Sequence, residues 1–362
     1  MSEFHTKYSA RIRAGQNNNF DKFNFELTTL ELLQNQTVQV PLKTRIKRFL
    51  KQILGKVPSV KMTDYLDRFG DVYDLLTDQA SKDLLVELAA YRELGPTKIR
   101  LPLFQENYRE EVLALKKYMD LNDELSLKSS NWKLYRTDLR PMGHNIEAYM
   151  LPMTIQVDFV LKQYEYHHGD RNVMVEPGDT VFDIGGFIGD TALYFAELVG
   201  ENGNVHVFEF IPSNLELLNN NINLNPALKE KIKIVSSPVW NEPGKRAWFS
   251  DYGPSSRVSF QEFVGSEGLV STVSIDSYVA ENKIEKVDFI KMDIEGAEPY
   301  ALKGATETIR KHKPNLAIAI YHNLDDMVNI PTFLNDLQVG YKFYLGHYTI
   351  HKSETILFAT IK

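Results

Sequence analysis

The stretch GDTVFDIGGFIGDTALYFA, residues 178–196, decides the fold. It runs from a turn into an apolar strand, and then through three glycines into a helix, which is how a βαβ unit begins. In a doubly wound parallel sheet, ligands bind outside the carboxyl ends of the strands, beside the helix that follows the first strand. We therefore expect the turn from Asp183 to Thr191 to hold a nucleotide-like ligand.

The composition of this turn argues against a dinucleotide. The G-x-G-x-x-G fingerprint has a glycine where this chain has Asp183, and a carboxylate there would repel a pyrophosphate. A nicotinamide-dependent oxidoreductase is therefore the weaker alternative. S-adenosylmethionine suits the turn better, because it carries an ammonium group and a sulfonium. We expect Asp183 to pair with the ammonium, directly or through water, and the helix N-terminus to accept the carboxylate.

The remainder of the C-terminal half repeats the alternation of apolar strands and helices. We predict strands in NVHVFEF, IKIVSS, VDFIKMDI, NLAIAIYH, GYKFYLGHY and ETILFATIK, with a β-rich excursion from Trp248 to Val273. This pattern specifies an α/β fold with a doubly wound, mostly parallel sheet covered by helices on both faces. Glu209 ends the strand after the glycine turn, where an acidic side chain receives ribose hydroxyls. The segment Ser213 to Glu216 reads as a capping box at the next helix.

Three regions follow from these patterns. Residues 1–125 are predicted to form a helical N-terminal domain, because FELTTLELL, LKTRIKRFLKQIL, MTDYLDRFGDVYDLL and KDLLVELAAYREL space their apolar residues by three or four. Residues 126–176 read as a β-rich bridge that includes KLYRTDL, IEAYMLP and TIQVDFVLKQYEY. Residues 177–362 form the expected cofactor-binding domain.

Three segments, FDIGGFIGDTALYFA, VFEFIPSNLELLNNNI and VDFIKMDIEGAEPYALKGA, together resemble the FkbM family of S-adenosylmethionine-dependent methyltransferases. The resemblance implies the class I methyltransferase fold, Rossmann-like with an antiparallel last strand, and methylation of hydroxyl oxygens, often on sugars or natural-product scaffolds. It also implies which residues contact the cofactor. Glu209 would contact the ribose, and the methionine part would be lined by Asp183, Gly185, Gly186, Gly189, Asp190 and Thr191. The chain differs from the family at two places. Gly186 stands where the family more often has alanine, and Phe210-Ile211-Pro212 stands where the family more often has Glu-Pro. We also place Phe210 and Tyr164 beside the cofactor.

The strand VDFIKMDIEG carries the expected catalytic groups. Side chains two residues apart in a strand point the same way, so Lys291 and Asp293 share a face, and Glu295 lies just beyond. A lysine in an apolar strand needs a partner, so Lys291 is read either as an ion pair with Asp183 or Asp293 or as a catalytic group. Asp293 is expected to orient the acceptor hydroxyl, to help place the sulfonium or to ligate a divalent metal.

Two histidines follow predicted strands at the same edge of the sheet. His322 and His347 are candidate general bases, since an imidazole titrates near neutral pH. Glu354 opens the last strand and reaches this edge if that strand is antiparallel. The grouping of Asp293, Glu295 and His322 suits Mg²⁺ or Mn²⁺, although we do not favour a metal requirement.

The overall composition of the chain limits which kinds of partner and chemistry we expect. A formal charge of −7 argues against a nucleic-acid partner, and the absence of cysteine excludes thiolate chemistry and disulfides. The start MSEFHTKYSARIRAG lacks a signal-peptide core and no run suits a membrane span, so we expect a cytoplasmic protein without an integral membrane segment. We expect a small-molecule or saccharide acceptor and a helical N-terminal domain that covers it or forms a homodimer. The rival is a non-catalytic binding module with a methyltransferase fold.

Overall fold

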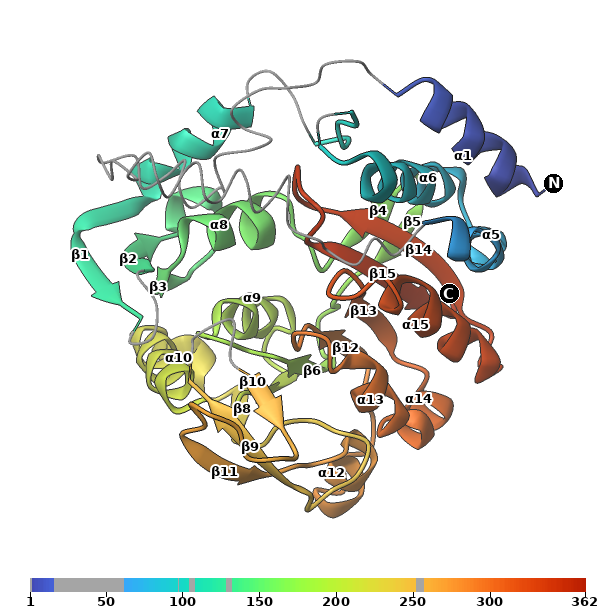
Figure 1. The fold of residues 1–362 in the computed structure, drawn as a ribbon. Coiled ribbons are helices and arrows are strands. Elements are labelled where there is room, and N and C mark those ends of the chain that lie inside the picture. The colour runs from blue at the N-terminus through green and yellow to red at the C-terminus, as the bar shows by residue number, and fades with distance from the viewer. Residues whose placement is uncertain (1, 16–61, 97, 104–107, 128–131, 252–256) are drawn as a thin grey trace.

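A seven-stranded sheet forms the centre of the molecule (Figure 1). The computed structural model describes residues 2–15, 62–96, 98–103, 108–127, 132–251 and 257–362. The strand order is β14-β15-β13-β12-β6-β7-β8, and β15 runs antiparallel to the other six strands. The α/β class and the antiparallel last strand predicted from the sequence are confirmed. The order reverses between β6 and β12, so the topological switch point lies at the carboxyl ends of these two strands.

The strands of this sheet are β6 (Thr180–Ile184), β7 (Asn204–Phe208), β8 (Ile232–Val235), β12 (Phe289–Met292), β13 (Asn315–Ala319), β14 (Lys342–His347) and β15 (Thr355–Thr360). The helices between them are α9 (Asp190–Leu198), α10 (Pro212–Leu224), α11 (Pro226–Lys229), α12 (Ile275–Glu281), α13 (Glu298–Lys303), α14 (Thr306–His312) and α15 (Asp326–Asp336).

Side-chain alternation divides the core into two layers, one on each face of the sheet. Phe182 and Ile184 of β6 join a cluster with residues of α12 to α15, whereas Val181 joins a cluster with residues of α9. Asp183 has the same parity as Val181 and therefore points to the α9 face. The same rule places Lys291 on that face with Phe289, as the sequence predicts.

The N-terminal helices pack on the opposite face. They are α1 (Glu3–Arg13), the 3₁₀ turn η1 (Met62–Asp64), α5 (Leu66–Leu75) and α6 (Gln79–Leu94), and their apolar side chains share one cluster with those of the sheet. The edge strand β14 is covered where Phe343 O accepts from Thr77 N at 2.9 Å and Leu345 N donates to Ser81 Oγ at 2.9 Å. Covering an edge strand in this way prevents it from pairing with another chain. The predicted helices in residues 25–33 and 42–54 lie outside the described residues.

The region before the central sheet departs from the sequence prediction in two places. After α7 (Tyr108–Ala114) and the 3₁₀ helix η2 (Leu115–Tyr118), strand β1 (Met119–Ser126) begins inside the segment predicted to be helical. The segment TIQVDFV, predicted as a strand, instead continues the one-turn helix α8 (Pro152–Thr154) as the π-helix η4 (Ile155–Val160). Pro152 at a helix start favours this outcome, and the period-two alternation is misleading because both faces of η4 are buried.

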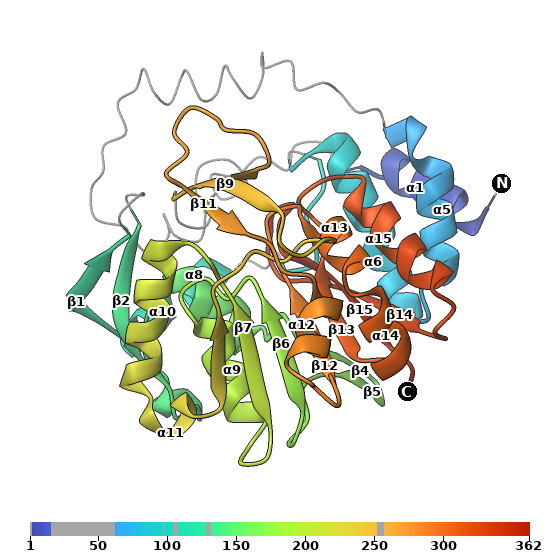
Figure 2. The ribbon, with the colours of Figure 1, turned by 90° about the horizontal axis from the view of Figure 1, so that it is seen from below.

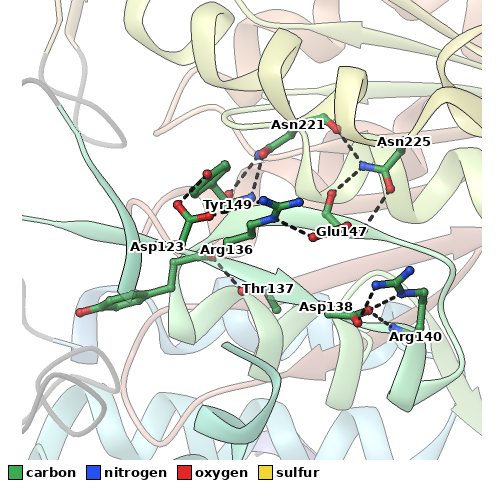
Figure 3. Close-up of polar contacts among 10 residues, drawn as sticks. Asp123, Arg136, Thr137, Asp138, Arg140, Glu147, Tyr149, Asn221 and Asn225 are labelled. Carbon is green, nitrogen blue, oxygen red and sulfur yellow. Dashed lines mark hydrogen bonds and ion pairs between the residues drawn. The ribbon is translucent and has the colours of Figure 1, made fainter. Parts of the chain in front are cut away.

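A small antiparallel sheet is formed by β1, β2 (Lys133–Asp138) and β3 (Glu147–Met150), with the 3₁₀ turn η3 (Arg140–Met142). It is joined by asparagine side chains to α10 and to Asn225, the residue that follows α10 (Figure 3). Asn221 accepts from Tyr149 N at 2.8 Å and donates to Tyr149 O at 3.0 Å. Asn225 makes the same pair of hydrogen bonds with Glu147, at 2.9 and 2.7 Å. We call these four hydrogen bonds the asparagine ladder; it satisfies the free edge of β3 as a neighbouring strand would.

Two smaller units complete the fold. Strands β4 (Tyr166–His168) and β5 (Arg171–Val173) form a hairpin, and β9 (Arg246–Ser250), β10 (Arg257–Ser259) and β11 (Gly268–Ser271) form the predicted β-rich excursion. In Figure 2 this excursion lies beyond one end of the central strands. Within the described part of the chain, no helix combines the length and the hydropathy that crossing a bilayer requires.

Candidate functional site

A cavity of about 400 Å³ opens at the carboxyl ends of β6, β7 and β12. This is within the usual range for small-molecule sites and lies at the switch point where the sequence places the ligand. Apolar residues line one part, including Phe208, Phe210, Ile211, Pro238 and Val239. Six carboxyl-bearing residues line the cavity, namely Asp158, Asp190, Glu209, Asp293, Glu295 and Glu354. Lys291 is the single lysine or arginine among the described lining residues.

The glycine turn is shaped by two close approaches. Gly185 has φ +90°, and a Cβ there would lie 1.9 Å from Asp293 O in the neighbouring strand. A Cβ on Gly186 would lie 2.0 Å from Val207 Cγ2, which accounts for glycine at a position where the related family commonly has alanine. The N–H groups of both glycines donate to Phe208 O, at 3.0 and 3.1 Å. These two N–H groups therefore hold the turn against β7.

Asp183 and Lys291 form a buried ion pair between adjacent strands. Lys291 Nζ lies 3.0 Å from Asp183 Oδ1 and donates to Gly185 O at 2.6 Å. The other carboxylate oxygen of Asp183 accepts from Thr191 Oγ1 at 2.7 Å. Burial alone would lower the pKa of Lys291, but the charges of Asp183, Asp293 and Asp190 outweigh it and raise the pKa. Of the two interpretations of Lys291, the geometry favours the ion pair.

The predicted methionine-binding residues divide into two groups. Gly185, Asp190 and Thr191 line the cavity, but Asp183, Gly186 and Gly189 lie behind it. Asp183 is fully buried, so the structure offers it no direct contact with a ligand in the cavity. Asp190 accepts from Thr191 N at 3.0 Å, so a side chain already occupies part of the helix N-terminus.

Glu209 lines the cavity where the sequence predicts ribose binding. It accepts from Phe210 N at 2.6 Å, Ile211 N at 2.8 Å and Asn214 Nδ2 at 3.2 Å. Burial raises its pKa to about 7 against the opposing effect of these donors. The predicted capping box is wrong: α10 begins at Pro212, and Ser213 Oγ donates to Asp251 Oδ1 at 2.5 Å. Proline at the helix start replaces the side-chain cap.

Asp293 stands at the centre of a polar group at the end of β12. Its Oδ2 accepts from Tyr164 at 3.2 Å and from Tyr321 at 3.1 Å, and its Oδ1 lies 3.4 Å from His322 Nε2. Tyr164 also covers Lys291 Nζ, 5.2 Å from the ring centroid. The carboxylate is thus held in one orientation at the cavity wall.

His322 lies among carboxylates rather than on the cavity lining. Its Nδ1 lies 3.1 Å from Glu298 Oε1, and its Nε2 lies 3.6 Å from Glu295 Oε2. Burial alone would lower the pKa of His322, but the contact with Glu298 and the charges of Asp293 and Glu295 raise it to about 9. The imidazole is therefore mainly protonated at neutral pH, and this disfavours its predicted role as general base.

The same side chains carry atoms that could ligate a metal ion. Asp293, Glu298 and His322 each offer a ligand atom within 4.8 Å of the others. However, Glu298 faces Nδ1 and Asp293 faces Nε2, whereas one ion binds through a single ring nitrogen. This arrangement fits an imidazolium between two carboxylates better than a metal centre.

Two further carboxyl groups face the cavity near Asp293. Glu354 precedes the antiparallel strand β15, as the sequence predicts, and burial with the charge of Asp293 raises its pKa to about 8. Burial raises the pKa of Glu295 to about 7. Both residues have positive φ, 56° and 58°. Backbone strain of this kind is concentrated at functional sites.

His347 does not reach the cavity. Its Nδ1 lies 2.8 Å from Thr355 Oγ1, and burial lowers its pKa to about 4. The strand direction is as predicted, but β15 separates β14 from the rest of the sheet, so the end of β14 is too far from the switch point. None of the described residues before Trp132 lines the cavity, so the described N-terminal helices do not cover it.

Sequence reasoning missed four residues of this site: Asp158, Gln163, Tyr321 and Glu298. Tyr321 precedes His322, and Glu298 follows Asp293 in the same DIEGAE segment, so position pointed to both. Asp158 lies in a segment predicted to be a strand. A charged residue within this largely apolar segment was the one sign in the sequence that it belongs to a site.

The known proteins to which this chain is similar are methyltransferases. Residues 183–343 match the model of the methyltransferase FkbM domain. Hexuronic acid methyltransferase AglP of Haloferax volcanii is 23% identical over 239 residues, which cover 63% of this chain and 92% of that protein. A crystal structure of methyltransferase FkbM from Methylobacillus flagellatus KT is similar with a TM-score of 0.52 at 18% identity, over 82% of this chain and 59% of that chain. The chain thus spans about three fifths of that protein's length, and this likeness shows the fold.

We predict that Gly185→Ala destabilises the protein strongly. The new Cβ would overlap Asp293 O, a backbone atom that cannot move without parting β6 from β12. We expect urea denaturation to show a loss of at least about 2 kcal/mol. Gly178→Ala is the matched control, because Gly178 has φ +93° but no atom near its added Cβ. Equal losses in the two variants would contradict the proposed contact.

We also predict that the melting temperature falls as pH rises from 6.5 to 9. The folded-state pKa values of Glu354, about 8, and His322, about 9, exceed the ordinary values of 4.5 and 6.5. The folded state therefore binds more protons in this window, and the stability that these groups contribute at low pH is lost as they deprotonate.

Scanning fluorimetry of the parent and of Glu354→Gln measures this effect. The variant should lose less stability between pH 6.5 and 8, whereas Glu262→Gln, at an exposed site, should behave as the parent. A melting temperature that stays level or rises in the parent would refute the assignment.

Proposed function

We propose that the chain is an S-adenosylmethionine-dependent O-methyltransferase acting on a hydroxyl of a saccharide, glycoconjugate or natural-product scaffold, because residues 183–343 match the model of the methyltransferase FkbM domain. The observation that carries the proposal is the placement of Asp293. Its carboxylate is oriented by two tyrosine hydroxyls at the wall of a cavity that begins at the glycine turn.

The lining fits the proposed cofactor at both ends. Glu209, held by Phe210 N, Ile211 N and Asn214, suits a pair of ribose hydroxyls, and the adjoining apolar wall suits an adenine ring. The acidic residues around Lys291 favour a ligand with net positive charge. S-adenosylmethionine supplies a methyl group on a sulfonium, so transfer forms a carbon–oxygen bond, breaks the carbon–sulfur bond with its electron pair on sulfur, and releases the hydroxyl proton.

We assign the roles of the side chains as follows. Lys291 holds Asp183 and Gly185, and so fixes the glycine turn. Asp293 orients the acceptor hydroxyl. Glu354 lines the cavity, whereas His322 does not, and we assign Glu354 as the base that accepts the proton. With a pKa of about 8 its carboxyl group is mainly protonated at neutral pH, but the ionised fraction is a stronger base than an ordinary carboxylate. His322, as an imidazolium, positions Asp293.

A similar protein supports a saccharide acceptor, and the residues that line the cavity indicate which kind of saccharide group reacts. The name of the relative from Haloferax volcanii concerns a hexuronic acid, which supports a saccharide acceptor. In the described lining, however, Lys291 is engaged with Asp183, whereas the carboxyl groups of Asp293, Glu295 and Glu354 face the cavity. These groups favour an uncharged sugar hydroxyl over a sugar carboxylate at the reacting position.

The proposal is tested by transfer of isotope-labelled methyl from S-adenosylmethionine to a panel of neutral sugar nucleotides, uronic acids, oligosaccharides and cell-envelope extracts. We expect label in a neutral saccharide fraction, with and without a chelator. Asp293→Asn should retain cofactor affinity and lose at least about a hundredfold in turnover, and Glu354→Gln should lose a similar amount.

Two outcomes would overturn this function. Cofactor binding without transfer to any fraction would favour the non-catalytic binding module, whose mark is affinity without turnover. Binding of NADH in a fluorescence titration, with none of S-adenosylhomocysteine, would favour the oxidoreductase.

A further inference from the structure

Among the described residues that line the cavity, three side chains have a buried acceptor atom without a hydrogen-bond partner. One is Asn214, whose amide nitrogen already donates to Glu209. The other two atoms are Asp158 Oδ1 and Gln163 Oε1, on side chains of residues that are 5% and 4% exposed. A buried carboxylate or amide oxygen without a donor costs free energy, so such atoms are rare in folded proteins. Their position at a cavity wall indicates that a ligand supplies the donors.

These two residues come from outside the FkbM domain. Asp158 lies in the π-helix η4, and Gln163 N donates to Val157 O at 2.9 Å, which folds the chain back so that Gln163 lies close to η4. π-Helices are rare and are found frequently at functional sites.

The electrostatic surroundings of Asp158 favour a cationic ligand, because a positive charge beside it would offset the cost of burying its ionised form. Burial raises its pKa well above the ordinary value, and the charge of Asp190 adds to this, while Lys291 opposes it. Lys291 cannot neutralise Asp158 by direct contact, since its ammonium is engaged by Asp183 and Gly185. Asp190, at the start of α9, adds a second carboxyl group to the same corner of the cavity.

We propose that Asp158 and Gln163 bind the α-ammonium group of the cofactor's methionine end, together with Asp190. This rests on the proposed function and adds a binding site supplied by the segment before the FkbM domain. An ammonium offers three donors, which matches the carboxylate of Asp158, the amide oxygen of Gln163 and the carboxylate of Asp190. Asp158 interacts with the charges of Asp190, Lys291 and Asp183, which lie at the glycine turn, and this assigns the pair to the methionine end, since Glu209 is assigned to the ribose end.

Calorimetric titration with three probes tests the inference. S-adenosylhomocysteine carries the α-ammonium, its deaminated analogue lacks only that group, and 5′-methylthioadenosine lacks the whole amino-acid part. The parent should bind the deaminated analogue at least about tenfold more weakly than S-adenosylhomocysteine, as expected for loss of a charge-assisted hydrogen bond. This comparison needs no variant and so does not depend on folding.

Variants then locate the site. Asp158→Asn and Gln163→Leu should weaken S-adenosylhomocysteine by about tenfold and about threefold, and leave 5′-methylthioadenosine unchanged. Gln156→Leu is the matched control, because Gln156 is also buried in η4 with an unpartnered Oε1 but does not line the cavity. It should not change either affinity.

The outcomes separate this inference from the function on which it rests. Equal affinity of the parent for S-adenosylhomocysteine and its deaminated analogue, or equal effects of Asp158→Asn on S-adenosylhomocysteine and 5′-methylthioadenosine, would refute the ammonium site and leave the methyltransferase proposal standing. Failure of the parent to bind any of the three probes would overturn both.

Discussion

The ion pair between Asp183 and Lys291 is the interaction on which the site depends. The two residues are directly opposite in adjacent parallel strands, and Lys291 also holds the carbonyl of Gly185. One lysine thus connects the last residues of β6, the first glycine of the turn and, through Asp183 and Thr191, the start of α9. Removing one partner of a buried pair leaves an uncompensated charge, at a cost of about 3–5 kcal/mol. The pair stabilises the shape of the turn, and contact with a ligand is left to other residues.

The remaining charges are arranged around this pair with an excess of carboxyl groups. His322 is surrounded by Asp293, Glu295 and Glu298, and Lys291 by Asp183, Asp190 and Asp293. Each cation is committed to an internal partner, so a ligand meets mainly carboxyl groups. Burial raises the pKa values of Asp190, Glu209, Glu295 and Glu354, and neighbouring carboxyl groups add to this for Asp190, Glu295 and Glu354. The cavity is therefore poised to exchange protons near neutral pH.

The fold and the position of the cavity were predictable because they depend on local pattern. Hydrophobic periodicity identified the strands, and the position of Asp183 before three glycines located the switch point. The roles of His322 and His347 were not predictable, because the pKa of an imidazole depends on groups such as Glu298 that only the fold brings near. The helical state of residues 154–160 was hidden because Gln156 and Asp158 alternate with apolar residues as in a half-exposed strand, although both side chains are buried. Asn221 and Asn225 gave no signal, because an amide side chain on a helix rarely replaces a neighbouring strand.

The asparagine ladder bears on how a ligand enters and leaves. Strand β3 leads directly into Pro152 and η4, whereas α10 begins just after Glu209. Four hydrogen bonds join the two elements, each contributing about 0.5–1.5 kcal/mol. Moving β3 away from α10 would break all four together, so the strand that leads into η4 is held in place. The distance between Asp158, which follows β3, and Glu209, which precedes α10, is therefore preorganised. The cavity then selects ligands by their length as well as by their charge.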